Sequence, residues 1–418
     1  MADGILMPTT SAQVSGHKFL VRRIEHGLVL RDIRMIHDPL ASRRRAMVFG
    51  LVACVMLAVG ALVLALFRPA LNPGEARLIR AESGALFVRV EDKVHPVANM
   101  ASAQLILGEV MEPAAASDEI LAQWPRGIPL GLVDAPGIIS TEEHETAWFA
   151  CQVTESGTTH VVAAGTGQLA QPRLLAGQQG WLGASQSGNG ELNWHLITAQ
   201  GRQLLPAEDS EHGRIVRRHL GINADTPRVY LSADLLNNIP QLPDISFPDP
   251  LPEIITTGTR AWVHSEAGIA PINALTEGML LDAGSRSTAQ SRALLGGYPE
   301  TDSALSLPTT LVEWSAPPVI CADGQGKVGF YGQLPEGVAL SGNTVAASFI
   351  SDLGGGVAVD SGFGFYLVAD SGLRHHLVDA QALEALGLSQ TQQVPWSVLR
   401  LLPEGSELSR EAALTPMY

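Results

Sequence analysis

The run "AMVFGLVACVMLAVGALVLALF", residues 46–67, decides how the chain is organised, because its 22 residues carry no charge. At a helical rise of ~1.5 Å per residue it would form a rod of roughly 33 Å, enough for a bilayer core of about 30 Å. A signal-peptide apolar region is shorter, about 7–15 residues, and lies near the N-terminus before a small-residue cleavage site. Here Arg68 and Pro69 follow the run, and it lacks the polar stripe of a soluble core helix. We therefore expect an uncleaved transmembrane helix.

Charge is divided unevenly on the two sides of this run. Residues 1–45 hold eight basic and four acidic side chains, a net charge of +4, whereas residues 68–418 hold 19 basic and 38 acidic ones, a net charge of −19. Lys and Arg are retained on the cytoplasmic side of a membrane span. We expect a single-pass protein of the cytoplasmic (inner) membrane, with its N-terminus in the cytoplasm and its bulk in a periplasm-like, extracytoplasmic space. The acidic bulk argues against nucleic-acid binding, which needs a basic surface.

The segment before the span has the pattern of a basic amphipathic helix. Its apolar residues recur at helical intervals: Val29, Ile33, Ile36 and Leu40. We expect Ser15 to cap this helix and Pro39 to end it. Its charged face includes four arginines: Arg22, Arg23, Arg31 and Arg34. Such a helix lies on the anionic inner leaflet or docks on a cytosolic partner. We assign the four arginines to partner binding, because the arginines at 43–45 already supply the charge that sets topology.

Cysteine usage agrees with an extracytoplasmic exterior. Cys54 lies within the span, which leaves Cys151 and Cys321 as a pair outside the membrane. Such a compartment permits disulfides, and no CxxC motif suggests redox or zinc chemistry. We expect the two outer cysteines to be linked, which the chain-entropy argument values at ~5 kcal/mol for so long a loop. Two free buried thiols are the alternative.

One order of elements recurs four times outside the membrane: strand, turn, strand and helix. In the last copy a strand-like run at 365–368 is followed by a turn, a second short run and a helix that ends at Gly387. The other copies begin at Leu86, Trp194 and Ala261. The expected helices are 101–107, 214–220, 293–295 and 380–386. A unit of this size cannot bury its own apolar face alone and needs a neighbour. This predicts an α/β exterior of four small strand-strand-helix repeats.

Two further strand-like blocks each contain one of the outer cysteines. "AWFACQVTESGTTHVVAAG" turns at Ser156-Gly157, and "PPVICADGQGKVGFYGQL" turns at Asp323-Gly324. We expect these blocks to pair as a central β domain. The Pro-rich stretch "PQLPDISFPDPLP" is expected to act as a semi-rigid spacer between the second and third repeats.

These assignments divide the chain into nine segments. The expected boundaries are 1–45 for the cytoplasmic segment, 46–67 for the transmembrane helix, 75–140 for repeat 1, 146–180 for the first part of the central β domain, 181–239 for repeat 2, 240–252 for the Pro-rich linker, 253–312 for repeat 3, 313–350 for the second part of the central β domain, and 351–418 for repeat 4 and the C-terminal tail.

Two blocks of sequence resemble a known family. One is "TSAQVSGHKFLVRRIEHGLVLRDIRMIHDPL", followed by "RRRA", a single span and an Arg-Pro exit. The other is the tail "FYLVADSGLRHHLVDAQALEALGL…VPWSVLRLLPEGSELSREAAL". Both are similar to EccB, the single-pass membrane component of the actinobacterial type VII (ESX) secretion system. The resemblance implies four repeats around a central β domain and a structural role in the secretion complex.

The same resemblance implies the partners of the chain. They are the FtsK/SpoIIIE-like ATPase EccC, EccD, EccE and the mycosin protease. Self-association as a dimer within a larger ring is also expected. Solenoid-like exteriors must cap or pair exposed strand edges. We expect the first and last repeats, around Phe87 and Tyr366, to be the terminal ones that offer such edges.

No motif indicates an enzyme, and we expect no catalytic, cofactor-binding or metal-ligating residues. "DGQGKVGF" is not a Walker loop, because Val328 follows Lys327 where Ser or Thr is required. Two other functions stay open. A hydrolase or ATP-hydrolysing enzyme without a recognisable motif is one, since a triad is identified by geometry. The other is a cell-wall-binding module in which Trp181, Trp194 and Trp262 stack on sugars, although such tryptophans more often fill the core.

Overall fold

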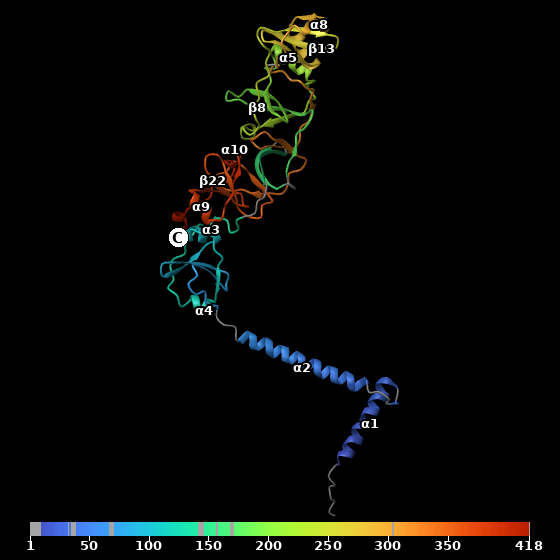
Figure 1. Ribbon diagram of the computed structural model, residues 1–418, viewed down its shortest axis with the longest axis vertical. Coiled ribbons are helices and arrows are strands. Elements are labelled where there is room, and N and C mark those ends of the chain that lie inside the picture. The colour runs from blue at the N-terminus through green and yellow to red at the C-terminus, as the bar shows by residue number, and fades with distance from the viewer. Residues whose placement is uncertain are drawn as a thin grey trace, which may run out of the picture. The chain divides into compact units, whose positions relative to one another are not determined.

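The computed structural model of the 418-residue chain describes residues 10–31, 33–34, 39–66, 71–140, 146–155, 158–167, 171–302 and 305–417. The chain divides into two compact units, residues 1–71 and residues 72–418. Figure 1 shows the two long helices of the first unit and the small sheets of the second. The expected turn at Ser156-Gly157 lies outside the described residues.

The first unit contains two helices, α1 (Ser11–Leu30) and α2 (Pro39–Leu66). Thr10 caps α1 in a capping box, because its hydroxyl accepts from the Gln13 N–H while its own N–H donates to the Gln13 side chain. Arg31 ends the helix in the left-handed region, with φ of 54°. The basic helix is therefore present, but it begins before Ser15.

The predicted end of the basic helix was wrong. The left-handed turn at Arg31 places Ile33 beyond α1, and Ile36 lies outside the described residues. Pro39 begins α2 instead of ending α1. The physical reason is that a proline is tolerated in the first turn of a helix, where its missing N–H leaves no hydrogen bond unmade.

Helix α2 carries the apolar run. Ser42–Leu64 is a stretch of 23 residues with a mean hydropathy of 2.8, and none of it is buried by the rest of the protein. A helix of this length and composition can cross a bilayer. It is the one such helix in the part of the chain that the structure describes. This agrees with the predicted span, of which Phe67 lies outside the described residues.

Four sheets of the second unit share one topology. Each has the order third, second, first and fourth strand, with the fourth strand parallel to the first and the others antiparallel. Repeat 1 contains β1 (Leu78–Ala81), β2 (Leu86–Val90), β3 (Lys93–Val97) and β4 (Ala114–Ala116). Repeat 2 contains β8 (Gln179–Gln186), β9 (Leu192–Thr198), β10 (Gly201–Leu204) and β11 (Arg228–Leu231). Repeat 3 contains β12 (Glu253–Thr257), β13 (Arg260–Ser265), β14 (Gly268–Ile272) and β15 (Ser287–Ala289). Repeat 4 contains β21 (Val357–Asp360), β22 (Phe365–Val368), β23 (Arg374–Leu377) and β24 (Gln392–Gln393).

Each repeat has one main helix between its third and fourth strands and one short helix after its fourth strand. The main helices are α3 (Met100–Leu107), α5 (Glu211–His219), α7 (Ala274–Asp282) and α9 (Ala380–Ala385). The short helices are α4 (Asp118–Leu121), α6 (Ala233–Leu236), α8 (Arg292–Leu295) and α10 (Trp396–Leu399), and α11 (Arg410–Ala413) follows repeat 4. Every main helix begins at a side-chain cap, and the capping residues are Asn99, Ser210, Asn273 and Asp379.

These elements confirm four α/β repeats and correct one of them. The helix predicted at 293–295 is the short α8, and the main helix of repeat 3 is α7, which follows Asn273. The first and fourth strands of the repeats were also missed. Several of these strands span only two to four residues, which is too short for the alternation of apolar and polar residues to identify a strand.

A proline after each short helix protects the outer edge of its sheet. The carbonyl groups of these prolines accept hydrogen bonds of 2.8–3.0 Å from the backbone N–H groups of the third strands. The accepting prolines are Pro125, Pro240, Pro299 and Pro403, and the donors are Val94, Arg202, Ile269 and Arg374. We call each of these pairs a proline latch. The latch pairs a strand edge that would otherwise be open to another chain.

The repeats pack in pairs through their main helices. Repeats 1 and 4 share a core that includes Leu105 of α3 and Ala385 of α9. Repeats 2 and 3 share a core that includes Val216 of α5 and Met279 of α7. Asp282 strengthens the second pair, because its carboxylate accepts from Arg218 at 3.2 Å and from His219 at 3.0 Å. Each helix face is therefore covered by the helix of a neighbouring repeat.

The central sheet is assembled from two separated segments. Its order is β19-β20-β6-β5-β17-β18-β7. The first segment supplies β5 (Ala147–Glu155), β6 (Thr158–Thr166) and β7 (Arg173–Leu174). The second supplies β17 (Val319–Ala322), β18 (Val328–Tyr331), β19 (Val338–Ala339) and β20 (Ser348–Ser351). The remaining strand, β16 (Glu313–Trp314), pairs with β8 of repeat 2.

One face of the central sheet contacts two of the repeats, and the other face forms a core of its own. Trp148 of β5 packs in a core with repeat 4, and Ile320 of β17 packs in a core with repeat 2. The alternate residues Phe149 and Val153 belong to a separate core of the central sheet itself. Repeats 2 and 4 therefore contact the central sheet, whereas repeats 1 and 3 pack on repeats 4 and 2. The expectation that the terminal repeats are the first and the last was wrong, because the repeats farthest from the central sheet are the first and the third.

The Pro-rich segment 240–252 packs against the repeats and does not hold them apart. The N–H of Leu242 donates to the Arg202 carbonyl, and the N–H of Ile245 donates to the Leu204 carbonyl, both at 2.9 Å. Ile245 and Phe247 are both buried in the core that repeats 2 and 3 share. The spacer prediction was wrong because the apolar residues between the prolines contribute to this core.

Replacing Gly405 by Ala should destabilise repeat 4. The new Cβ would lie 2.4 Å from Cε1 of His375, which is fully buried and donates to the Ser406 carbonyl at 2.9 Å, so the ring cannot move freely. We expect a loss of about 1–3 kcal/mol, as for other overpacked cores. Thermal unfolding of the detergent-solubilised protein would measure it. Gly354→Ala is the matched control, because no atom lies within 4 Å of its added Cβ. Equal unfolding midpoints for the two variants would contradict this prediction.

Candidate functional site

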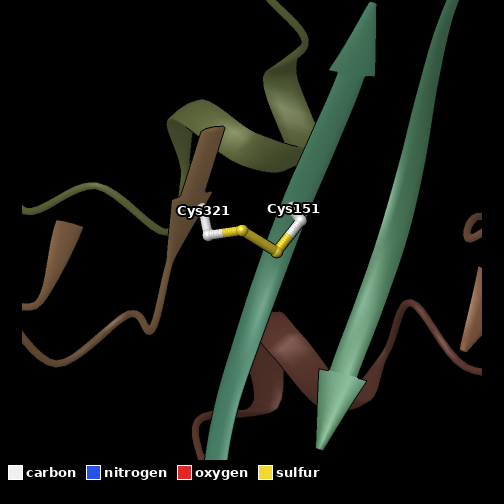
Figure 2. The surroundings of a disulfide bond; sticks show 2 residues. All are labelled: Cys151 and Cys321. Atoms are coloured by element: carbon white, nitrogen blue, oxygen red, sulfur yellow. A yellow bond between two sulfur atoms is a disulfide. The ribbon is translucent and has the colours of Figure 1, made fainter. Parts of the chain in front are cut away.

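The disulfide lies in the middle of the central sheet. Cys151 of β5 and Cys321 of β17 are direct cross-strand neighbours, and both are fully buried. Their sulfur atoms form a disulfide between positions that are 170 residues apart in the chain (Figure 2). Cys54 is free and exposed on α2. The two segments of the central sheet are thus joined covalently as well as by backbone hydrogen bonds.

Repeats 2 and 4 also contact each other directly, through their short helices. Arg400, which directly follows α10, donates to the Asp234 carboxylate of α6 at 2.6 Å. Asn238, which follows α6, accepts at its carbonyl from the Gly324 N–H of the central sheet at 3.1 Å. Its side chain donates to the Ser397 carbonyl of α10 at 3.4 Å. The two repeats and one loop of the central sheet therefore meet at a single polar junction.

That loop belongs to the Gly-rich stretch that resembles a nucleotide loop. One carboxylate oxygen of Asp323 accepts from the N–H groups of Gln325, Gly326 and Lys327 at 2.8, 2.9 and 2.8 Å. In a phosphate-binding loop such N–H groups point at the anion. Here the carboxylate of the protein occupies them, so the loop is a self-capped turn.

A buried Ser-His pair in repeat 2 was not identified from the sequence. Ser185 Oγ and His195 Nε2 lie 2.8 Å apart in a hydrogen bond between β8 and β9. Burial is the main cause that lowers the pKa of His195 to about 4, and the charge of Arg202 lowers it further, while Asp244 opposes the shift. The imidazole is therefore neutral at pH 7. Only the spatial pairing of the two strands brings these residues together.

The Ser-His pair lacks the third member of a catalytic triad. His195 Nδ1 is buried and has no hydrogen-bond partner among the described residues. A triad needs an acidic group there to orient the ring and to stabilise the imidazolium. Both side chains are more than nine-tenths buried. The pair can cross-link two strands, but its geometry does not support nucleophilic catalysis. Among the described residues, no group of three His, Cys, Asp or Glu side chains could hold a metal ion.

The three tryptophans considered for sugar binding occupy different environments. Trp181 is fully buried and meets Phe330 edge to face, with ring centroids 6.2 Å apart. Trp194 is half-buried beneath the guanidinium of Arg228, 5.2 Å from its ring centroid. Trp262 is half-buried in β13. Trp181 is a core residue, and the other two are partly covered.

The four arginines assigned to partner binding do not form one surface. Arg22 lines a hollow between α1 and the start of α2, together with the arginines at 43–45. Arg23 is exposed on another side of α1, and Arg31 occupies the left-handed position at its end. Arg34 lies beyond the helix. The structure therefore separates Arg22 from the rest of the group.

These features define a membrane protein with one candidate span, an exterior of paired repeats and no recognised reaction centre among the described residues. The family model described as "Type VII secretion system ESX-1, transport TM domain B" matches residues 6–267 and 306–417. The chain therefore belongs to the EccB family of type VII secretion membrane components.

Curated relatives cover almost the whole chain. The chain is 28% identical over 462 aligned positions to "ESX-1 secretion system ATPase EccB1" of Mycobacterium tuberculosis strain H37Rv, with 97% of the chain and 94% of the relative covered. It is also 28% identical to "ESX-3 secretion system ATPase EccB3" of Mycolicibacterium smegmatis, with 97% and 90% covered. Both relatives are named as ATPases, and that description applies to them.

Solved structures share the fold. A chain in an intact ESX-5 inner membrane complex matches with a TM-score of 0.68 and 24% identity, covering 100% of this chain and 97% of that one. A chain of an EccB3 dimer from the ESX-3 core complex matches with a TM-score of 0.66 and 23% identity, covering 81% and 100%. These likenesses confirm a mixed α/β exterior of the EccB type.

Acid should destabilise the protein through His195. The pKa of this group is about 4 in the folded state against an ordinary value of 6.5, so the unfolded state binds more protons between these two pH values. Stability should therefore fall by about 3 kcal/mol as the pH drops through this window. Thermal unfolding at pH 7, 5.5 and 4 should show a shallower acid dependence for His195→Gln than for the unchanged protein. The exposed His160 provides the control, His160→Gln, which should keep the full dependence. An unchanged slope in the His195 variant would contradict this prediction.

Proposed function

We propose that this chain is a scaffold subunit of an ESX-type secretion complex, which holds a large exterior beside the route of exported proteins. Membership of the EccB family supports the role of a structural membrane subunit. The observation that carries the scaffold proposal is the pairing of repeats 1 with 4 and 2 with 3 around a disulfide-linked central sheet. That construction favours a rigid body with several outer surfaces over a cleft that binds a small substrate.

The proposed partners are other subunits of such a complex: the ATPase EccC, EccD, EccE and the mycosin protease. We also propose self-association. Two solved proteins with this fold support assembly, since one comes from an intact inner membrane complex and the other is described as a dimer. The identity of each neighbour is carried over from the family resemblance.

Purification of the complex in mild detergent tests the scaffold role. A tag on this chain should recover the other membrane subunits in fixed proportion, as measured by quantitative mass spectrometry of the extracted complex. Recovery of this chain alone, under conditions that keep another tagged subunit in its complex, would refute the proposal.

The proposed orientation places the N-terminus in the cytoplasm. It rests on the net charge of +4 for residues 1–45 and −19 for residues 68–418. External protease, applied to cells with a permeabilised wall, should digest the region after residue 71 and spare an N-terminal tag. Western blotting with tags at the two ends would show which end survives. Protection of the C-terminal tag, with lysed cells as the positive control for cleavage, would reverse the orientation.

We further propose that Arg23 and Arg31 bind acidic groups on a cytosolic partner. Both side chains are exposed, and the guanidinium fork suits bidentate contacts with carboxylates. The double reversal Arg23→Glu and Arg31→Glu should leave membrane insertion intact and reduce recovery of EccC or EccD about ten-fold or more, because two charge-assisted contacts are lost. Co-purification measures this.

A matched double reversal on the exterior gives the control. Arg80→Glu and Arg260→Glu change the net charge equally at two exposed positions. This variant should retain EccC and EccD. If both double variants keep the full complex, α1 has no such partner and the assignment of its arginines fails.

A further inference from the structure

A hollow of about 1050 Å³ lies between the second half of α1 and the beginning of α2. Both helices belong to the first compact unit. The residues that line the hollow are Arg22, Glu25, His26, Val29, Arg43, Arg44, Arg45, Met47, Val48 and Phe49. Four of its ten lining residues are arginines and one is acidic. This balance favours an anionic ligand.

The α1 side of the hollow is one stripe of the helix. Arg22, Glu25, His26 and Val29 are spaced by three, one and three residues, so they lie on one face. His26 is 4% exposed on this face, although Glu25 and Leu28 are exposed. Arg23 is absent from the lining of the hollow, although it adjoins Arg22 in sequence. The chain therefore provides two adjacent arginines, of which only one faces the hollow.

The α2 side combines charge with apolar surface. The arginines at 43–45 are followed directly by Met47, Val48 and Phe49, which are 79%, 55% and 74% exposed. These three residues open the apolar part of the span, so this end of α2 lies where headgroups meet acyl chains. A ligand that satisfies both parts of the wall must carry an anionic head and an apolar tail.

We propose that this hollow binds an anionic phospholipid. Arg22 and the arginines at 43–45 hold the phosphate through charge-assisted, fork-shaped hydrogen bonds. Val29, Met47 and Phe49 contact the first carbons of the acyl chains. Glu25 repels the phosphate, so the arginines must outweigh it, and they do so by four charges to one. The bound lipid joins α1 to the start of the span.

The apolar wall distinguishes a lipid from free phosphate. A free anion would leave Met47, Val48 and Phe49 uncovered, whereas acyl chains cover them at no electrostatic cost. Basic clusters beside a span gain about 1 kcal/mol per Lys or Arg at an anionic membrane surface. Loss of one arginine from the hollow should therefore weaken lipid binding about five-fold.

Native mass spectrometry of the full-length protein in detergent tests this inference. Dioleoyl-phosphatidylglycerol is titrated into the micelles, and the fraction of protein with one bound lipid is measured. Arg22→Gln should need about five-fold more lipid for half-occupancy. Arg23→Gln is the matched control, with the same change of charge at the next position, and should bind as the unchanged protein does. Arg22 and Arg23 both lie outside the span. Both variants keep the arginines at 43–45, which we expect to set the orientation of the span.

Two further arms identify the ligand chemistry. Dioleoyl-phosphatidylcholine should bind more weakly than the anionic lipid, and millimolar inorganic phosphate should not displace the lipid. Phe49→Ala should lower the affinity for the lipid without creating any affinity for phosphate. Equal binding of the two lipids, equal effects of Arg22→Gln and Arg23→Gln, or full displacement by phosphate would each overturn the proposal.

Discussion

The fold depends on one constraint: a sheet of four short strands with one helix on it cannot bury all of its apolar surface. Each repeat meets that constraint on its helix side by pairing with another repeat. On the opposite side, repeats 2 and 4 are covered by the central sheet. Among the described residues, repeat 1 has no such neighbour. It covers its outer face with Leu121 of α4 and with Trp124, whose ring lies 4.2 Å beneath the Arg89 guanidinium. In repeat 3, His264 takes the position of Arg89 and Tyr298 takes the position of Trp124. Their ring centroids are 5.0 Å apart.

Because of this division, repeat 2 resembles repeat 4 in its side chains, and repeat 1 resembles repeat 3. Arg202 in repeat 2 and Arg374 in repeat 4 occupy the same place beside a proline latch. Each donates through Nε to the carbonyl just before the latch proline, at 3.2 and 3.1 Å. Repeats 1 and 3 have Val94 and Ile269 there. The repeats that contact the central sheet therefore share one set of side chains, and the outer repeats share another. The kind of repeat therefore depends on contact with the central sheet, and the two kinds alternate along the chain.

Sequence reasoning succeeded where a long pattern or a rare residue carried the information. The uncharged run of α2 was sufficient to predict a span, and the two outer cysteines were sufficient to predict the pairing of the two β segments. The helix of repeat 3 was misplaced because "ALTEGMLLD" has no clear polar face, while a shorter apolar run stood before Gly296. The Pro-rich segment was misread because composition describes the stiffness of a chain but not what its intervening apolar residues contact. The Ser185–His195 hydrogen bond could not be found because it depends on strand register between β8 and β9.

The placement of the disulfide affects both the biosynthesis of the exterior and its response to proteolysis. Repeats 2 and 3 are both encoded between Cys151 and Cys321, so they form an insertion whose two ends are fastened to each other. That lobe stays attached to the central sheet at both ends, and a single backbone cut within it leaves two fragments that still travel as one molecule until a reductant is added. Biogenesis is constrained in the same way, because the closing cysteine emerges only after the entire lobe has been synthesised. The central sheet, although its first strands come early, is completed by residues from the last quarter of the chain.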